Sequence, residues 1–408
     1  MNKNPVIFYG AGAHALMTFK RCSTEISPRK VVAFCDRDTS KYSKKLLGLP
    51  IMSLESAKCL YSDFNIYITA NEFHAPAIIA FLLENGVSEE RIINHRPIER
   101  ARGCVEIENY LVISPYSNVG GKAGFCCGNF NRSKSPFIEL KNASGLSEFF
   151  ELRDKMMDDM ANHTESGSCF GCPHIREHWR FKEKSLRGIR YGGNFICNCK
   201  CTYCSGWENV DSHLSHIFII NVIDYLENHS ECNQRHYHLF PGEIAIHPQN
   251  RPLLEKVKGH DLVIGTNATI YSEALADVLS LGRSVINVSL DSGTRETYNK
   301  VKGIDAFDKV RENLHRYAEN GKIVLKYIFM QGVNDTDRDL DGFFSLADAV
   351  ADNVVFSRNY RDENDLSDHS LKMIDRFINH FNESELILST GEGEKLREGE
   401  HARFEQLS

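Results

Sequence analysis

The feature that most limits the fold is a sixfold alternation of apolar runs and amphipathic segments between residues 185 and 365. The apolar runs have the length and composition of strands, and the segments between them have the apolar spacing of helices. The expected strands are GIRYGGNFI, HYHLF, DLVIGTN, VINVSL, IVLKYIFM and NVVFSRN. Because strands that alternate with helices pair in parallel, the pattern predicts an α/β fold with a partial, TIM-like (β/α)6 barrel.

Other segments surround this barrel pattern. Residues 1–98 alternate strand and helix signals on a smaller scale, which predicts a Rossmann-like domain. Residues 104–182 mix short strand-like pieces, glycine turns and a polar helix, and we expect a separate segment there. The barrel is expected to occupy residues 185–387, and residues 388–408 form a polar tail.

The composition is that of an ordinary globular protein, with 42% apolar residues, 25% charged residues and a net charge of −7. This charge disfavours a nucleic-acid partner, and no apolar run has the roughly 20 residues that would span a membrane. The first residues enter a strand directly, without the pattern of a signal peptide. We therefore expect a cytoplasmic protein.

Thirteen cysteines are unusual for such a protein, and tight cysteine groups there more often bind metal than form disulfides. The run FICNCKCTYC places Cys197, Cys201 and Cys204 directly after the first barrel strand. Three thiolates on one loop can bind three irons of a [4Fe–4S] cluster and leave the fourth iron open. The alternative is a zinc site with Cys199 as fourth ligand, although Cys199 alternates too tightly with its neighbours to wrap one tetrahedral ion comfortably.

The CxxxCxxC spacing, with Tyr203 before the last cysteine, resembles the signature of the radical S-adenosylmethionine (SAM) superfamily. The resemblance implies that SAM chelates the open iron and that an electron from the cluster cleaves it. The products are methionine and a 5′-deoxyadenosyl radical, which abstracts hydrogen from a substrate. An electron donor such as flavodoxin or ferredoxin is implied as a partner.

Later segments resemble the superfamily's SAM-binding motifs in their usual order, each at the carboxyl end of an expected strand, where barrel active sites lie. The Pro-Gly-Glu after the second strand resembles the GGE motif and implies that Glu243 meets the SAM amino group. The Gly-Thr-Asn-Ala after the third strand resembles TNG, and the Ser-Leu-Asp of the fourth resembles a serine–aspartate strand end. Pro241 and Ala268 replace glycines of these motifs. The implied SAM contacts are Tyr203, Gly242, Glu243, Thr266, Asn267, Ser289, Asp291 and Lys302.

A second cysteine group, Cys126, Cys127, Cys169 and Cys172, precedes the barrel. Four thiolates would close a site completely, which suits an auxiliary [4Fe–4S] cluster or, alternatively, zinc. The layout resembles the twitch domain, a shortened relative of SPASM that follows the barrel in most radical SAM proteins. Because adjacent cysteines cannot always reach one cluster, either Cys126 or Cys127 is expected to be idle.

Near the amino terminus, Gly10, Gly12 and Ala15 form a GxGxxA turn between a strand and a helix, and Asp36 ends the next strand. This layout predicts a nucleotide site with amides near phosphate and the carboxylate near ribose. The domain resembles Rossmann-like domains that accompany sugar-modifying enzymes. A helix-packing turn that binds nothing is the equal alternative.

Together these features predict a radical SAM enzyme with a small-molecule substrate, either a nucleotide-linked sugar or a glycan precursor. One alternative is a maturase that modifies a ribosomally made peptide or protein. From another class, the chain could be a non-catalytic iron–sulfur or zinc protein. The sequence leaves dehydrogenation, epimerisation and crosslinking open and identifies no catalytic hydrogen donor.

Overall fold

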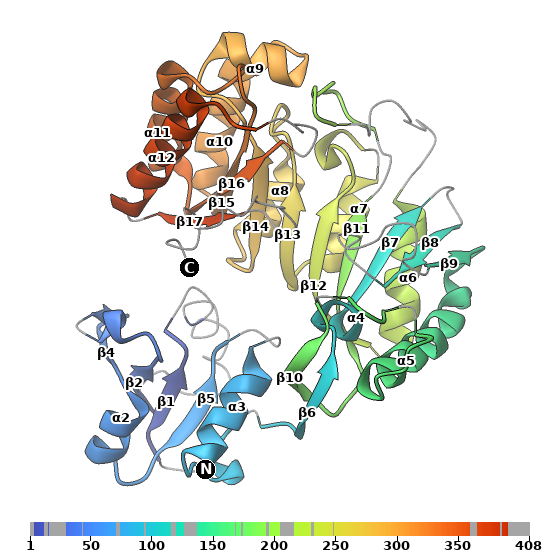
Figure 1. The fold of residues 1–408 in the computed structure, drawn as a ribbon, viewed down its shortest axis with the longest axis vertical. Helices are drawn as coiled ribbons and strands as arrows, with labels where there is room; N and C mark the ends of the chain where they lie inside the picture. Colours follow the sequence, from blue (N-terminus) through green and yellow to red (C-terminus); the bar gives the residue numbers. More distant parts are fainter. Residues whose placement is uncertain are drawn as a thin grey trace. The chain divides into compact units, whose positions relative to one another are not determined.

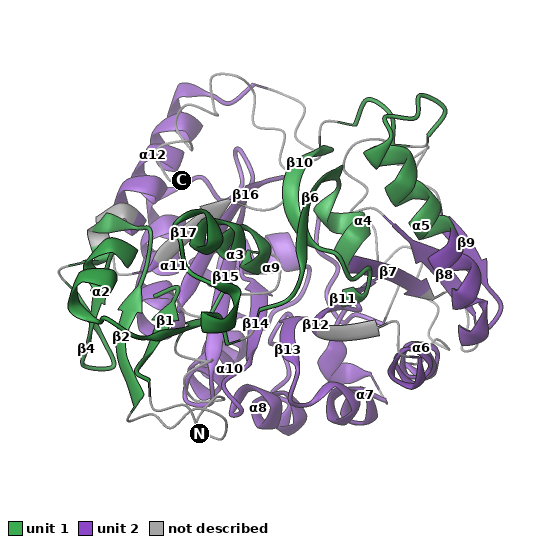
Figure 2. Ribbon diagram, turned by 90° about the horizontal axis from the view of Figure 1, so that it is seen from below, with its two compact units in different colours: residues 1–109, 152–187 green, residues 110–151, 188–408 purple. Residues whose placement is uncertain are grey.

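The protein is described from a computed structural model, which divides the chain into two compact units (Figures 1 and 2). Unit 1 combines residues 1–109 and 152–187, and unit 2 combines residues 110–151 and 188–408. The described residues are 4–11, 15, 30–42, 44–70, 74–93, 95–115, 120–125, 137–167, 169–172, 174–192, 196–204, 216–229, 232–247, 249–359, 365–383 and 386–390. The unit boundaries cut across residues 104–182, whose identity as a twitch-like domain stays a prediction.

Unit 1 contains a five-stranded sheet of order β3-β4-β2-β1-β5, in which β4, β2, β1 and β5 run parallel. Every residue of β1 and β5 is buried, as is typical of parallel strands covered on both faces. Odd-numbered β1 residues join one apolar cluster and even-numbered ones join the other. The elements are β1 Val6–Tyr9, β2 Val31–Cys35, β3 Lys45–Leu46, β4 Leu49–Met52, α2 Leu54–Leu60, β5 Asn65–Ile68 and α3 Ala75–Glu84, with short 3₁₀ turns at Thr39–Lys41 and Glu89–Arg91.

A two-stranded antiparallel ribbon of β6 Ile98–Gly103 and β10 Arg176–Phe181 completes unit 1. Helix α4 Val105–Asn109 follows β6, and helix α5 Leu146–Ala161 enters the unit at residue 152. Phe181 belongs to one apolar cluster of the parallel sheet, so the ribbon and the sheet share a core. Gly103 is required here because a Cβ at this position would lie 1.9 Å from Oε1 of Glu108.

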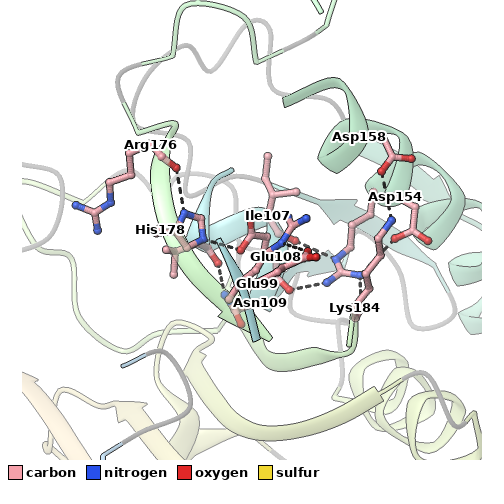
Figure 3. Close-up of polar contacts among 12 residues, drawn as sticks. Glu99, Ile107, Glu108, Asn109, Asp154, Asp158, Arg176, His178 and Lys184 are labelled. Atoms are coloured by element: carbon pink, nitrogen blue, oxygen red, sulfur yellow. Dashed lines mark hydrogen bonds and ion pairs between the residues drawn. The ribbon is translucent and has the colours of Figure 1, made fainter. Parts of the chain in front are cut away.

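Arg153 is the central polar residue of this part of unit 1, and its partners Ile107, Glu108 and Lys184 are labelled in Figure 3. Its side chain is only about 1% exposed, yet it donates hydrogen bonds to three backbone carbonyls. Nε donates to Ile107 O at 3.0 Å, Nη1 to Lys184 O at 2.7 Å, and Nη2 to Glu108 O. The guanidinium therefore joins α5, α4 and the segment after β10 by satisfying carbonyls that would otherwise be buried without a partner.

The buried Glu108 carboxylate contacts two side chains of β10, of which His178 is labelled in Figure 3. Its Oε2 lies 2.8 Å from Nε2 of His178, and its Oε1 accepts from Nη1 of Arg180 at 3.2 Å. Arg180 also donates to Oε1 of Glu99 at 2.8 Å. The hydrogen bond with Glu108 raises the pKa of His178, although burial opposes the shift.

Unit 2 is built on a ten-stranded sheet of order β17-β16-β15-β14-β13-β12-β11-β7-β8-β9. The pairs from β12 to β17 are parallel, as is the pair of β7 and β11, whereas β8 and β9 continue antiparallel. The strands are β7 Tyr110–Pro115, β8 Gly121–Gly124, β9 Phe137–Leu140, β11 Leu186–Gly192, β12 Cys232–Phe240, β13 Asp261–Gly265, β14 Ser284–Ser289, β15 Lys322–Phe329, β16 Asn353–Arg358 and β17 Ile387–Thr390. Among the described residues, β17 and β9 do not pair, so the sheet is open and the predicted partial barrel is confirmed.

Helices follow the strands of unit 2, and α8, α10 and α12 pack against β14, β15 and β17 (Figure 1). Three of them begin at a hydroxyl N-cap: Ser272, Thr294 and Thr336 each accept from a backbone N–H of the first turn. The helices are α6 Ile217–Asn228, α7 Asn250–Val257, α8 Glu273–Leu279, α9 Arg295–Lys302, α10 Phe307–Ala318, α11 Asp337–Val350 and α12 Asp368–Glu383, with 3₁₀ turns at Ala143–Gly145 and Ile244–Ile246. No helix in the described ranges is both long and apolar enough to cross a bilayer.

Two features differ from the sequence expectation. The strands at Tyr110–Pro115 and Phe137–Leu140 belong to the sheet of the barrel, because β7 pairs with β11 in parallel. In addition, β17 extends the sheet into the predicted polar tail by pairing with β16. Residues 391–408 lie outside the described part of the chain.

Replacing Arg153 by Met should lower the free energy of unfolding of unit 1 by about 3 kcal/mol or more, because the carbonyls of Ile107 and Glu108, both in buried hydrogen bonds, and the partly buried carbonyl of Lys184 lose their donor. Trp179 lies on β10, so its fluorescence reports this unit in urea titrations once Trp207 is replaced by Phe. Lys155→Met, an exposed change on the same helix, should cost less than about 0.5 kcal/mol. Equal effects of the two changes would contradict the role given to Arg153.

The stability of unit 1 should also depend on His178. Because the folded-state pKa is raised, protonated His178 stabilises the folded state below its unfolded pKa of about 6.5, and this contribution disappears as the pH rises through the folded pKa. The unfolding free energies of wild type and His178→Gln should therefore differ more near pH 5.5 than near pH 9. A difference that does not change with pH would show that the pair with Glu108 is not charged.

Candidate functional site

The loop at residues 196–204 carries the central cysteines and is fixed at two places. Near its start, the backbone N–H of Glu243, after β12, donates to Ile196 O at 3.0 Å. Further along, the N–H groups of Lys200 and Thr202 donate to the carbonyls of Lys302 and Val301, each at 2.9 Å, at the end of α9. The loop therefore lies across the carboxyl ends of the strands, as predicted for a barrel active site.

Gly303 permits the close approach of this loop to α9. It caps the helix in the left-handed conformation, with φ of +68°. A Cβ at this position would lie 3.0 Å from Lys200 O, so glycine is needed for both conformation and space.

Cys197, Cys201 and Cys204 are partly exposed, whereas Cys199 is buried. A hydrogen bond with the Cys199 thiol lowers the pKa of Cys197 and, together with the charge of Lys302, lowers the pKa of Cys201 to about 6. Burial opposes both shifts. The thiolate is the form that binds a metal, so these cysteines are well suited as ligands. The Cys199 thiol therefore lies within hydrogen-bond reach of Cys197 and Cys201.

Glu243 fixes the opposite side of the loop. It is fully buried, and its Oε1 accepts from Ala245 N and from Oγ1 of Thr266, each at 2.8 Å. Its Oε2 accepts from the backbone N–H of Asn267. Burial raises the pKa of Glu243, while these three donors oppose the rise. The carboxylate thus holds the end of β12 to the end of β13.

The side chain of Asn267 lies against the cysteine sulfurs. Its Nδ2 is 3.2 Å from Sγ of Cys199 and 3.7 Å from Sγ of Cys197. It also donates to Oδ1 of Asn198 at 2.8 Å, and its own Oδ1 accepts from N and Oγ1 of Thr269 at 3.0 and 2.7 Å. Asn198 and Thr269 were not among the predicted site residues, although Asn198 lies inside the cysteine motif and Thr269 directly follows Gly-Thr-Asn-Ala.

Ala268 has a left-handed backbone, with φ of +55°. Glycine adopts this conformation readily and alanine does not, which explains why glycine suits the end of a TNG motif. The conformation is held by Thr266, whose Oγ1 accepts from Ala268 N at 3.1 Å, and by Asn313, whose Nδ2 donates to Ala268 O at 2.8 Å.

Asp291, Tyr203 and Lys302 form a buried polar cluster at the end of β14. Oδ2 of Asp291 accepts from the Tyr203 hydroxyl at 2.7 Å and pairs with Nζ of Lys302, which also lies 2.6 Å from the Tyr203 oxygen. Oδ1 accepts from Ile328 N at 2.8 Å. Burial alone would lower the pKa of Lys302, but the Asp291 carboxylate holds it above its usual value. This cluster joins the cysteine loop to β14, α9 and β15.

The remaining predicted residues of the barrel lie at neighbouring strand ends. Gly242 follows β12 with φ of +65°, and Ser289 ends β14 half-buried, paired in register with Lys326 of β15. The buried Asn334 donates to Asp291 O at 2.8 Å and so supports the cluster from behind. Whether the predicted residues contact SAM stays a prediction.

The residues fit a [4Fe–4S] cluster better than a single ion. Among the described residues, no three His, Cys, Asp or Glu side chains surround a common point as ligands of one metal ion would. Three partly exposed cysteines on one loop, two of them with lowered pKa, instead match a set in which each thiolate binds a different iron. Cys197, Cys201 and Cys204 would hold that group.

The second cysteine group is described only in part. Cys169 and Cys172 flank a tight turn in which Gly171 has φ of +78° and Cys172 N donates to Cys169 O at 3.0 Å. Both thiols are partly exposed. Cys126 and Cys127 lie outside the described residues.

The predicted nucleotide loop of unit 1 is held by Asp36. Its Oδ2 accepts from Ala11 N at 2.7 Å and from Nζ of Lys41 at 3.1 Å, and its pKa is lowered by such donors although burial opposes this. Gly10 has φ of +109°, and a Cβ there would lie 2.8 Å from Oγ1 of Thr69. Ala15 is buried in the adjoining apolar cluster. Gly12 is outside the described residues.

Two buried histidines near the cysteine loop were not predicted as site residues. The rings of His216 and His247 are 3.8 Å apart, and Nδ1 of His216 is 2.8 Å from the Tyr191 hydroxyl. Burial and the neighbouring His247 lower the pKa of His216 to about 3, so this ring is neutral. The number of histidines in the sequence does not indicate this arrangement, because Tyr191, His216 and His247 come from three separate segments.

Comparisons with known proteins point to one superfamily. Residues 194–347 match the family described as the Radical SAM superfamily. The chain is 26% identical over 149 residues to GTP 3',8-cyclase of Haemophilus influenzae (strain 86-028NP), covering 35% of this chain and 44% of that protein. It is 29% identical over 164 residues to a probable GTP 3',8-cyclase of Saccharolobus islandicus (strain Y.N.15.51 / Yellowstone #2), covering 38% and 51%. The chain thus spans about half the length of the curated relatives it matches.

Among solved structures, the fold resembles Streptococcus suis SuiB bound to S-adenosylmethionine, with a TM-score of 0.41 and 12% identity over 72% of each chain. For residues 194–347, the resemblance predicted from the cysteine spacing is confirmed by this sequence match.

Replacing Ala268 by Gly should raise the free energy of unfolding of unit 2 by about 1 kcal/mol, because the left-handed backbone then carries no Cβ penalty. The same change at Ala276, inside helix α8, should lower it by about 1 kcal/mol or more. Chemical denaturation of both variants measures the two signs. Destabilisation by Ala268→Gly would show that the loop conformation is not strained.

Proposed function

Residues 194–347 belong to the radical SAM superfamily, and on this premise we propose that the chain is an enzyme that cleaves SAM at a [4Fe–4S] cluster. The observation that supports this most directly is the loop of three partly exposed cysteines, fixed at the carboxyl ends of the barrel strands. Cys197, Cys201 and Cys204 would bind three irons. When bound, such a cluster supplies the electron that divides SAM into methionine and a 5′-deoxyadenosyl radical.

The surrounding residues prepare the thiols for this role. The positive charge of Lys302 lowers the pKa of Cys201 and so favours its thiolate. Lys302 is itself kept in the charged form by its ion pair with Asp291. Tyr203 ties the loop to the same carboxylate. Because these groups are buried, their hydrogen bonds place the loop without depending on solvent.

Glu243 can also serve SAM directly. A carboxylate has about four acceptor positions, and Glu243 uses three of them within the protein. By this count one acceptor position remains for the ammonium group of SAM, as the Pro-Gly-Glu motif implies, and the proposed contact requires the fully buried carboxylate to become exposed when SAM binds. Gly242, Thr266, Ser289 and Asp291 complete the proposed SAM surface.

We also propose a nucleotide-linked substrate, such as a nucleotide sugar or glycan precursor. The curated relatives are named for GTP, a nucleotide. In unit 1, Asp36 follows β2 and lies beside the Gly10 turn, the position from which a carboxylate contacts ribose in nucleotide-binding folds. A flavodoxin- or ferredoxin-like donor would deliver the electron, and Cys169 and Cys172 would contribute ligands to an auxiliary cluster.

Anaerobic reconstitution with iron, sulfide, SAM and dithionite tests the proposal. We expect about four irons per chain for one cluster or about eight for two, and formation of 5′-deoxyadenosine. Cys204→Ala should lower 5′-deoxyadenosine formation at least a hundredfold, whereas Cys199→Ala should keep the iron content of wild type, because the proposal assigns no iron to Cys199. Zinc without iron, or a loaded cluster that never cleaves SAM, would favour the non-catalytic alternatives.

The substrate class is tested with the same enzyme. Only the true substrate should accelerate 5′-deoxyadenosine formation, so nucleotide sugars and ribosomally made peptides are compared at equal concentration. Acceleration by peptides alone would replace the nucleotide-linked substrate with a peptide and leave the SAM chemistry intact.

A further inference from the structure

The side-chain amide of Asn267 has only one orientation that satisfies its neighbours. Asn198 Nδ2 donates to Oγ1 of Thr269 at 2.7 Å, so the Thr269 hydroxyl proton is free to go to Oδ1 of Asn267, 2.7 Å away. The backbone N–H of Thr269 donates to the same oxygen. An amide NH₂ group could not accept a hydrogen bond from either of these donors. The oxygen of Asn267 therefore faces Thr269, and its nitrogen faces away.

The nitrogen of Asn267 therefore points to the cysteine loop. One of its hydrogens goes to Oδ1 of Asn198 at 2.8 Å, which closes a ring of three side chains. The other is directed at the sulfurs of Cys199 and Cys197, at 3.2 and 3.7 Å. Both distances are within the range of hydrogen bonds to sulfur, which are longer than those to oxygen.

The backbone of Asn267 is as firmly placed as its side chain. Its N–H donates to Oε2 of the fully buried Glu243, and the preceding Thr266 donates to the other oxygen of that carboxylate. The next residue, Ala268, is held by Asn313. The amide thus has no freedom to turn away from the sulfurs without breaking bonds on both sides.

We propose that Asn267 is a positioning residue whose Nδ2–H, which lies 3.2 Å from Sγ of Cys199 and 3.7 Å from Sγ of Cys197 here, donates to the Cys197 thiolate when a cluster is bound and thereby raises the reduction potential of the cluster. Hydrogen bonds to cluster sulfurs are one of the factors that set this potential. The reduced cluster carries one more negative charge than the oxidised cluster, so a fixed donor stabilises the reduced form more. The inference rests on the proposed function, because it presupposes a cluster on Cys197.

Asn267→Asp tests the inference with almost no change in shape. The carboxylate keeps an oxygen toward Thr269 but turns an oxygen, rather than an N–H, toward the sulfurs. At the midpoint potential of wild type, the ratio of reduced to oxidised cluster should fall by about tenfold or more, equal to a negative shift of about 59 mV for one electron. Redox titration followed by the electron paramagnetic resonance signal of the reduced cluster measures it.

Two further variants distinguish this effect from a general disturbance of the loop. Asn267→Ser removes the donor without adding charge and should shift the potential in the same direction by a smaller amount. Asn313→Ala loosens the same loop through Ala268 O but removes no donor from sulfur, so its potential should match that of wild type. Each variant is compared only after its iron and sulfide contents equal those of wild type.

The outcomes separate this inference from the proposed function. Wild type that binds no cluster would overturn the proposed function itself. A loaded wild type with the same potential in Asn267→Asp and Asn267→Ser would overturn only the inference, as would a shift of equal size in Asn313→Ala. Weaker SAM binding in Asn267→Asp at an unchanged potential would make Asn267 a SAM contact instead.

Discussion

The buried carboxylate of Glu243 is the constraint on which the site depends. A fully buried carboxyl group is stable only when hydrogen bonds replace its water, and Glu243 has three donors from the ends of β12 and β13. Its own backbone N–H donates to Ile196 O at the start of the cysteine loop. One residue therefore fixes the relative positions of two strand ends and of the loop that carries the cysteines. The contact of Asn267 with the sulfurs follows from this arrangement.

Asp291 fixes the other end of the cysteine loop. Its carboxylate accepts from Tyr203 of the loop, pairs with Lys302 of α9 and accepts from Ile328 of β15. A buried ion pair adds little net stability by itself, because desolvation offsets the attraction, but it specifies geometry since either partner alone would be costly to bury. The two carboxylates thus hold opposite ends of a short loop. That explains how a segment without regular secondary structure can present its cysteines in fixed positions.

The sequence predicted what depends on local pattern. Strand and helix periodicity gave the α/β class and the barrel strands, and cysteine spacing gave the superfamily, because both signals lie within a few consecutive residues. The partners of the site were not predictable in this way. Asn198 and Thr269 are 71 positions apart and meet only through the register of β11, β12 and β13. Similarly, YLVISP reads as a strand, but no local signal shows that β7 pairs with β11, and β17 is too short to be distinguished from a tail.

Pro241 and Ala268 stand where the motifs have glycine, and the cost of each follows from the backbone at that position. At Ala268 the left-handed backbone costs about 1 kcal/mol relative to glycine, yet Thr266 and Asn313 hold the loop in that conformation. Pro241 precedes Gly242, which retains the positive φ that the turn requires. Both substitutions alter glycine positions and leave in place the carboxylate that carries the framework, together with the residues it holds. The departures are therefore changes in local strain, and they give no reason by themselves to prefer a non-catalytic binding protein over an enzyme.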